Sequence, residues 1–207
     1  KMSKRISGDV ETEGFGMETR MLANDEFSYA LGSKGSTRRK LAAASGAVIE
    51  YVGRLACIAG NEEGRKRGQQ YLDWLLQQRQ GGTVDCGDPA SRDDCLVIDI
   101  PSESIGYITG HKGQSLREVE QRSSSFCFSA GHGQRKEAGA EKLFIFSHSE
   151  RNRVRARQIL EDKLDEHKRI GGRGGYGGGG RGRDRYDDRR GGYDDRGRGG
   201  YGGGRGR

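Results

Sequence analysis

The sequence predicts an α+β protein in which one module occurs twice, ahead of a glycine- and arginine-rich tail. A shift of 78 positions places the segment 22–35 on the segment 100–113 with four identities, which include both glycines of a Gly-x-x-Gly motif. Around both segments the hydrophobic pattern follows the same order, β-α-α-β-β-α. The matched pairs are Tyr29 with Tyr107, Gly32 with Gly110, Lys34 with Lys112 and Gly35 with Gly113.

The first copy of the module contains three predicted strands and three predicted helices. Apolar and β-branched residues predict the strands, and a tight turn at Gly53 joins the second strand to the third. Apolar residues at helical spacing predict that the last helix buries one face, made of Tyr71, Leu72, Leu75 and Leu76. The predicted strands are 17–22, 48–52 and 55–59, and the predicted helices are 25–31, 36–45 and 62–78.

The second copy repeats this order. The run "CLVIDI" is a short strand rich in β-branched residues, and "SFCFS" and "KLFIFS" are aromatic strands on either side of a polar loop. Leu116 and Val119 lie three positions apart and predict one face of a helix. The predicted strands are 95–100, 125–129 and 142–147, and the predicted helical segments are 102–109, 114–123 and 149–170.

These elements divide the chain into five predicted regions. They are an extension at 1–15 that we expect to be disordered, a first domain at 16–80, a linker at 81–94, a second domain at 95–170 and a tail at 171–207. The tail holds 18 Gly, 10 Arg, 5 Asp and 4 Tyr and no large aliphatic residue. It cannot bury enough apolar surface to offset the entropy of ordering, so we expect it to be disordered.

Composition excludes several classes of protein. The net charge is +7, of which the tail carries +5, so the folded part is nearly neutral. There is no apolar run near the length of a membrane span and no apolar segment typical of a secretory signal at the start. The four cysteines lack the spacing of a metal site, and we expect ordinary buried thiols in a protein of the cytoplasm, the nucleus or both, with no cofactor and no metal.

The glycine pairs suit the backbone of a nucleic acid. "GSKG" and "GHKG" both lie between the first two helices of their module. Glycine lets the main chain approach a ligand closely, and the second glycine begins a helix whose free N–H groups favour an anion. Lys34 and Lys112 add a charge that can neutralise a phosphate.

Motif and element order together resemble the K-homology (KH) domain of RNA-binding proteins, over 17–79 and 95–170. The resemblance implies two type I KH-like domains, each with a three-stranded sheet and three helices. It also implies that each Gly-x-x-Gly loop clamps about four nucleotides of single-stranded RNA while a hydrophobic groove takes the bases.

The implied RNA-binding residues fall into three sets. The loops supply Gly32, Ser33, Lys34, Gly35, Gly110, His111, Lys112 and Gly113, and the flanking basic residues are Arg38, Arg39, Arg135 and Lys136. The grooves map onto Phe27, Ala30, Leu31 and Ile49 in the first copy and onto Ile105, Ile108, Thr109 and Phe126 in the second. Each groove residue, taken singly, is as well explained by core packing.

The first copy departs from the family at one position. The family has an aliphatic residue three positions after the second glycine, as Leu116 is, but the first copy has Arg38. Either this helix is slightly rotated or its start is more exposed. The run Arg38–Lys40 is then a phosphate contact or simply solvated surface.

The stretch "GSKGST" does not fit a phosphate-binding P-loop. That motif needs Gly-x-x-x-x-Gly-Lys-[Ser/Thr] after a strand, and here a helix precedes the loop and the order is Lys-Gly-Ser. The four histidines are scattered, and no catalytic grouping can be placed on one face. The sequence therefore predicts a protein that is not an enzyme.

The tail resembles an RGG box, in which arginine and tyrosine alternate with glycine. Arginine can bind phosphates and stack on bases, and tyrosine offers a flat partner. The tail residues expected to contact RNA are Arg173, Tyr176, Arg190, Tyr193, Arg198 and Tyr201. The alternative is a flexible, solubilising tail.

We therefore expect a non-catalytic protein that binds single-stranded RNA in mRNA processing or post-transcriptional regulation. Single-stranded DNA is a second expected ligand, other RNA-binding proteins are expected partners of the tail, and no membrane partner is expected. The rival hypothesis is a protein-interaction scaffold, which the near-neutral charge of 1–170 favours.

Overall fold

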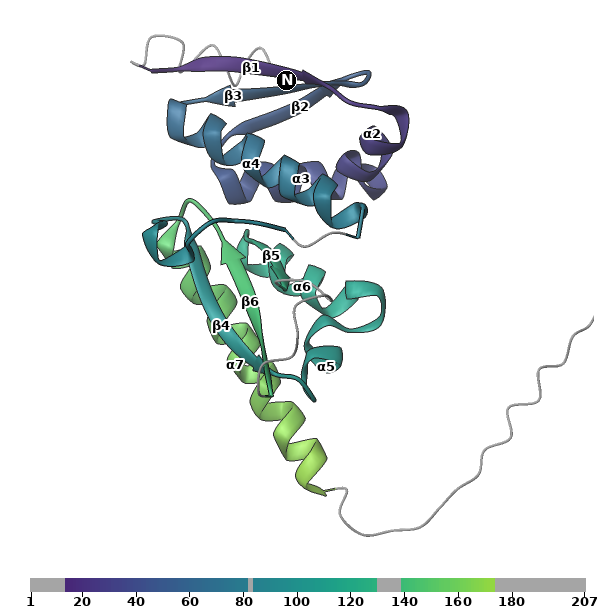
Figure 1. Ribbon diagram of the computed structural model, residues 1–207, viewed down its shortest axis with the longest axis vertical. Helices are drawn as coiled ribbons and strands as arrows, with labels where there is room; N and C mark the ends of the chain where they lie inside the picture. The colour runs from purple at the N-terminus through teal and green to yellow at the C-terminus, as the bar shows by residue number, and fades with distance from the viewer. Residues whose placement is uncertain (1–13, 82–83, 130–138, 174–207) are drawn as a thin grey trace, which may run out of the picture. The chain divides into compact units, whose positions relative to one another are not determined.

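A computed structural model describes residues 14–81, 84–129 and 139–173 of the chain. The predicted positions Arg135 and Lys136 lie outside these ranges, as do the tail positions from Tyr176 onwards. The described residues form two successive sets of strands and helices, labelled in Figure 1.

The first module contains one antiparallel sheet with strand order β1-β3-β2. Helix α4 packs on one face of this sheet, where it contacts β3 and β1. The strands are β1 (Gly16–Met21), β2 (Val48–Val52) and β3 (Leu55–Gly60). The helices are α2 (Asn24–Leu31), α3 (Ser36–Ser45) and α4 (Glu62–Arg79).

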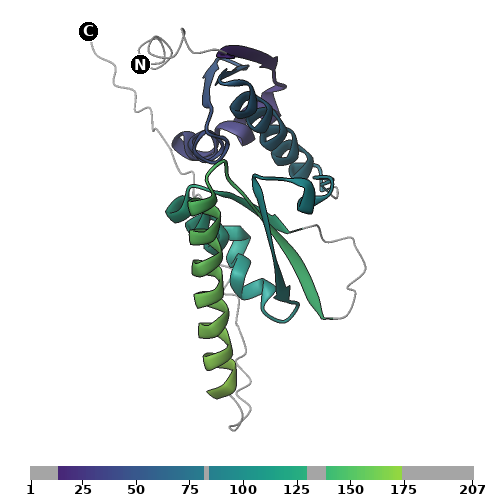
Figure 2. The ribbon, with the colours of Figure 1, turned by 90° about the vertical axis from the view of Figure 1, so that its left-hand side faces the viewer.

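The second module repeats the pattern with strand order β4-β6-β5. Its long last helix lies along its own sheet (Figure 2). The strands are β4 (Cys95–Pro101), β5 (Phe126–Ser129) and β6 (Ala140–Phe146). The helices are α5 (Ile105–Thr109), α6 (Gln114–Ser123) and α7 (Glu150–Arg173).

The predicted order β-α-α-β-β-α is confirmed in both modules, and the α+β class with two three-stranded antiparallel sheets is consistent with KH-like domains. Most boundaries coincide with the prediction or differ from it by one or two residues, as is usual for helix and strand ends, but α5 begins at Ile105, three residues after its predicted start. Helix α7 continues through Gly171 and Gly172 to Arg173, three residues beyond its predicted end.

Each module buries an apolar interior between its helices and its sheet. In the first module, Leu22, Leu41, Ile49 and Leu72 are almost wholly buried. In the second module the corresponding interior is made of Ile100, Ile108, Val119, Leu143, Ile145 and Leu160. Cys57, Cys86 and Cys127 are buried, and all four cysteines are free thiols, as predicted.

A cluster of aromatic side chains joins the two modules. Tyr71 and Trp74 of α4 pack against the outer face of the second sheet, the face that does not carry α7. That face presents Phe126, Phe128, Phe144 and Phe146, all 6% exposed or less. The rings of Trp74 and Phe146 lie 4.7 Å apart between centroids. The buried aromatic residues of the two modules therefore form one continuous hydrophobic cluster.

The segment between the modules is packed as well. Val84 and Cys86 are buried in the same cluster as the aromatic residues. Asp94 is 2% exposed, accepts a hydrogen bond of 2.9 Å from the Tyr71 hydroxyl and pairs with Arg92. The described residues from 14 to 173 accordingly form one compact unit that contains both modules. The division into two separate domains stays a prediction.

Among the described residues, no helix has both the length and the apolar composition that crossing a membrane requires.

Candidate nucleic-acid interface

The two Gly-x-x-Gly loops have nearly identical backbones. Gly32 and Gly110 both have φ of 68°, with ψ of 173° and 176°. Gly35 and Gly113 have φ of 74° and 75° and lie at the start of α3 and α6. In each loop the N–H of the second glycine donates to the carbonyl of the first at 3.1 Å. The repeat seen in the sequence is therefore a repeat of one local geometry.

The first glycine of each loop is required by the packing as well as by its positive φ. A Cβ at Gly32 would lie 2.2 Å from Thr37 Oγ1 and 2.8 Å from the Thr37 backbone nitrogen. A Cβ at Gly110 would lie 2.7 Å from Ser115 Cβ and 2.9 Å from its backbone nitrogen. Since backbone cannot move aside cheaply, only glycine lets the loop turn this closely onto the helix that follows.

The lysine of each loop is held in a left-handed conformation that is unusual for a side chain of this kind. Lys34 has φ of 51° and Lys112 has φ of 49°. An arginine from the first turn of the following helix stabilises each of them. Arg39 Nη1 donates to the Lys34 carbonyl at 2.8 Å, and Arg117 Nη2 donates to the Lys112 carbonyl at 2.7 Å. Each loop is thereby pinned with its lysine facing solvent.

Arg117 was not among the predicted site residues. It lies 78 positions after Arg39, so the offset that revealed the glycine pairs also matches these two arginines. Extending the repeat comparison four residues past the second glycine would have found it.

The helix starts behind the two loops are free of capping side chains among the described residues. The residues between the glycines, Ser33, Lys34, His111 and Lys112, are all exposed. No side chain caps the start of α3 or α6, where Gly35 and Gly113 occupy the cap positions. Backbone N–H groups at two helix starts therefore lie beside exposed cations, which favours an anion at each loop.

The predicted grooves divide into accessible and inaccessible residues. Ala30, Ile49 and Ile108 are 1% exposed or less and act as core packing. The half-buried residues are Phe27 and Leu31 in the first copy and Ile105 and Thr109 in the second. Only this second group can touch a base without rearrangement of the core.

Phe126 is placed away from the predicted groove. It is 1% exposed, and it packs against Tyr71 of the first module, with the ring centroids 5.7 Å apart. The reason is the two-residue period of a strand, because the position that matches Ile49 at the 78-residue offset is Cys127. Cys127 lies in the interior with Ile108, and Phe126 points to the opposite face of the sheet.

Arg38 also has a role other than the predicted one. Its guanidinium donates to the Ile49 carbonyl at 3.0 Å and forms an ion pair with Glu50, both on β2. Leu116, at the matching position of the second module, packs against the interior instead. The two helices begin at the same point of their loops, so the departure at this position is a change of side-chain partner and not a rotation of the helix.

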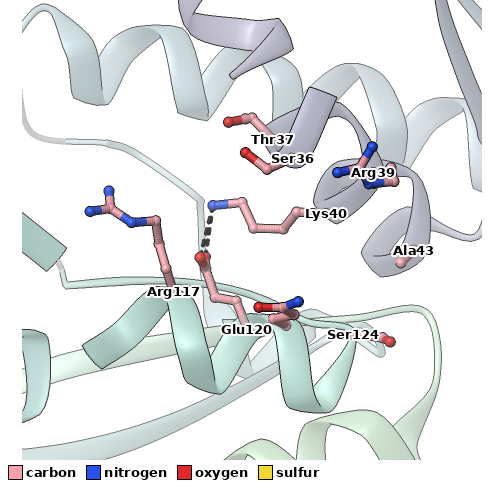
Figure 3. A pocket seen from close by; sticks show the side chains of 9 residues that line it. Ser36, Thr37, Arg39, Lys40, Ala43, Arg117, Glu120 and Ser124 are labelled. Carbon is pink, nitrogen blue, oxygen red and sulfur yellow. Dashed lines mark hydrogen bonds and ion pairs between the residues drawn. The ribbon is translucent and has the colours of Figure 1, made fainter. Parts of the chain in front are cut away.

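Lys40, the last residue of the basic run, is committed to the second module. Its Nζ lies 2.9 Å from both carboxylate oxygens of Glu120 (Figure 3). The same Nζ lies over the Phe126 ring. Glu120 is 3% exposed and accepts a further hydrogen bond of 2.9 Å from the Cys127 backbone N–H. Burial raises the pKa of Glu120, and the attraction of Lys40 opposes that rise. Of the three residues in the run, only Arg39 stays exposed at the loop.

The described residues contain no group of three or more histidine, cysteine or acidic side chains placed to hold a metal ion. His167 stacks on Tyr107 with the ring centroids 4.7 Å apart, and its Nδ1 lies 3.0 Å from Ser104 Oγ. The backbone N–H of His148 donates to the Ala44 carbonyl at 2.7 Å. His111 lies in the second loop, so the three described histidines occupy separate places.

No family model and no curated protein matches the chain. Among solved structures, a chain from the complex of a/eIF2alpha, aDim2p and rRNA of Pyrococcus horikoshii OT3 is 14% identical, with a TM-score of 0.30; the match covers 79% of this chain and 99% of that one. Dim2p from the same organism is 14% identical, with coverage of 72% and 90% and a TM-score of 0.28. A protein of unknown function from Aeropyrum pernix is 12% identical, with coverage of 75% and 94% and a TM-score of 0.27. The fold of this chain is defined by its own element order and strand register.

Proposed function

We propose that this protein binds single-stranded RNA through its two Gly-x-x-Gly loops, without catalysis. The observation that carries the proposal is the repeated loop geometry, with an exposed lysine at the tip and an uncapped helix start behind it. A turn with no ligand would not need the same strained lysine twice, each pinned by an arginine.

In this mechanism each loop holds the sugar-phosphate backbone and the half-buried residues beside it contact the bases. Lys34 and Lys112 neutralise phosphates, and the helix N–H groups donate to the phosphate oxygens. Phe27 offers an aromatic face in the first module, while Ile105 and Thr109 offer a smaller, aliphatic surface in the second. The proposal includes additional, non-specific contacts from the arginines of the tail.

The test replaces the residues between the glycines and keeps the glycines. The variant carries Ser33→Asp, Lys34→Asp, His111→Asp and Lys112→Asp, which puts two carboxylates beside each expected phosphate. We expect the affinity for short single-stranded RNA to fall by about ten-fold per loop, or about 1.4 kcal/mol each. The measurement is made on the full chain and on residues 1–173, because binding by the tail would mask the loss.

The control places the same charge change on helix α7, where Arg151→Asp, Arg155→Asp and Arg169→Asp alter three exposed residues far along the sequence from both loops. Circular dichroism and thermal unfolding establish that each variant is folded. RNA binding by the folded loop variant at the level of the control contradicts the proposal.

A protein-interaction scaffold is the second candidate function, and one observation favours it. The outer face of the first sheet exposes Met17, Met21 and Val52, which are 54%, 63% and 65% exposed. An apolar face of this kind is typical of a protein contact. If the loop variant binds RNA normally, or if the wild-type protein does not bind RNA, the scaffold becomes the better-supported function.

A further inference from the structure

A pocket of about 360 Å³ lies between helices α3 and α6, in the compact unit that contains both modules (Figure 3). Helix α3 follows the first Gly-x-x-Gly loop and helix α6 follows the second. The residues that line the pocket are Ser36, Thr37, Arg39, Lys40, Ala43, Arg117, Glu120, Gln121 and Ser124. The first five come from the first module and the last four from the second, so neither module forms this pocket alone.

The pocket is basic. Its described lining contains Arg39, Lys40 and Arg117 against a single carboxylate, that of Glu120. Glu120 already accepts hydrogen bonds from Lys40 and from the Cys127 backbone N–H, so this carboxylate is part of the buried floor. What remains toward a ligand is a surplus of two positive charges together with the hydroxyl groups of Ser36 and Thr37.

Both arginines are connected to the loops on either side. Arg39 and Arg117 each donate one guanidinium nitrogen to the carbonyl of their own loop lysine. A guanidinium carries five N–H donors, so each arginine keeps further donors after this bond. Each of these two arginines therefore lines the pocket and is also hydrogen-bonded to the loop of its own module.

We propose that this pocket binds a phosphodiester group of a single RNA strand that passes from one Gly-x-x-Gly loop to the other. The inference rests on the proposed function and specifies it further: both loops grip the same strand, and the linking phosphate is held between the modules. The guanidinium groups of Arg39 and Arg117 and the hydroxyl groups of Ser36 and Thr37 are donors that suit phosphate oxygens. The described lining has no aromatic residue on which a base could stack, so the backbone of the linking nucleotides occupies the pocket and not a base.

The first experiment is a charge series at Gln121, which is exposed and lines the pocket but belongs to neither loop. The probes are a four-nucleotide RNA, which reaches one loop, and an RNA of about twelve nucleotides, which reaches both. For the full chain we expect Gln121→Glu to weaken binding of the long RNA about five-fold and Gln121→Lys to strengthen it by a similar factor. Binding of the short RNA stays unchanged in both variants.

The matched control is the same series at Gln158, an exposed glutamine on α7. Gln158→Glu and Gln158→Lys change the net charge by the same amount, away from the loops of both modules. If they change the affinity for the long RNA as much as the Gln121 variants do, total charge alone determines binding and the proposal is overturned. Long-RNA binding that does not respond at Gln121 would overturn it as well. If wild-type protein binds neither RNA, or if the loop variant binds both normally, the proposed function itself has failed.

A second experiment leaves the protein unchanged. One phosphate at a time in the long RNA is replaced by a neutral methylphosphonate, and the full chain is titrated with each probe. We expect three sensitive regions, namely one for each loop and one between them, and the middle region loses its sensitivity in Gln121→Glu. Two sensitive regions with an insensitive stretch between them would overturn the proposal, even if the Gln121 variants had proved unstable.

Discussion

The two modules share one loop geometry and differ in the outer face of their sheets. In the second sheet this face carries four phenylalanines, and the first module covers it. In the first sheet the matching face carries Met17, Met21 and Val52, all more than half exposed. Strand register makes the comparison direct, because Ala59 lies between Met17 and Val48 in the first sheet and Phe146 lies between Cys95 and Phe126 in the second.

Because of this difference, two similar modules form an asymmetric contact. The contact needs an aromatic face on one sheet and an aromatic edge on one helix, and only α4 and the second sheet provide them. Helix α7 contains no phenylalanine, tyrosine or tryptophan. It therefore cannot make the aromatic contact with another sheet that Tyr71 and Trp74 of α4 make. The two loops are alike and the surfaces around them differ, and residues of the two helices that follow the loops line one pocket.

The largest expected effect comes from making the second face resemble the first. Phe146→Ala removes a wholly buried ring at the position where the first sheet has Ala59. We expect the free energy of unfolding to fall by about 3–5 kcal/mol, because the ring leaves a cavity between the modules. Urea denaturation of the variant and the wild type measures this loss of stability. Val52→Ala, on the open face, is the control and should change stability by less than about 0.5 kcal/mol; equal losses at the two positions would mean that the faces do not differ energetically.

The buried ion pair between the modules predicts a loss of similar size that depends on pH. Lys40→Met removes the partner of Glu120, and breaking a buried pair costs about 3–5 kcal/mol near neutral pH. Burial raises the pKa of Glu120, whereas Lys40 and, more weakly, Arg117 lower it, so the pKa rises further in the variant. The folded variant then holds a proton that the unfolded chain releases above about pH 4.3. Its stability therefore falls as pH rises above that value.

The measurement is the unfolding free energy of Lys40→Met and of the wild type at several pH values. The difference between them should be largest at neutral pH and shrink as pH falls toward 4. Lys66→Met breaks an exposed pair with Glu62 on α4 and should cost only a few tenths of a kcal/mol at every pH. A deficit of Lys40→Met that is independent of pH would show that Glu120 is not the group left without a partner.

The loops should respond alike, in contrast to the faces. Gly32→Ala and Gly110→Ala each force a Cβ onto the backbone of the following helix at a positive φ, and we expect each to cost about 2–3 kcal/mol. Gly53→Ala has a positive φ with open space around it and should cost about 1 kcal/mol. Thermal unfolding of the three variants provides the comparison. A loss confined to one loop would contradict the equivalence of the two geometries.

The smallest expected effect is a difference between the loops in RNA binding. We expect Lys112→Asp to weaken binding of short RNA about ten-fold and Lys34→Asp about three-fold, because the second module, with Leu116 at the aliphatic position, follows the KH pattern more fully and should bind short RNA more tightly. The full chain is required, since separating the modules would expose the phenylalanine face to water. Lys168→Asp on α7 is the charge control. A larger loss at Lys34 would reverse the order and give the first module the stronger contact.

The sequence by itself determined the local elements and the loops. Periodicity placed every strand and helix of both modules within a few residues, because hydrophobic spacing directly encodes which face of a short segment is buried. The repeat located both glycine pairs, since a loop that requires positive φ and close packing leaves glycine at fixed positions.

The tertiary structure alone decided which side chains remain available to a ligand. Phe126 and Lys40 looked like site residues, but each contacts the other module, at Tyr71 and at Glu120. Arg38 is hydrogen-bonded within its own module, to the Ile49 carbonyl. The hydrophobic pattern of a strand indicates which side chains are buried, but not which part of the protein covers them. A strand with the same alternation of residues can face a helix of its own module or a different module. The pocket between α3 and α6 depends on that docking, so it emerges only when both modules are folded together.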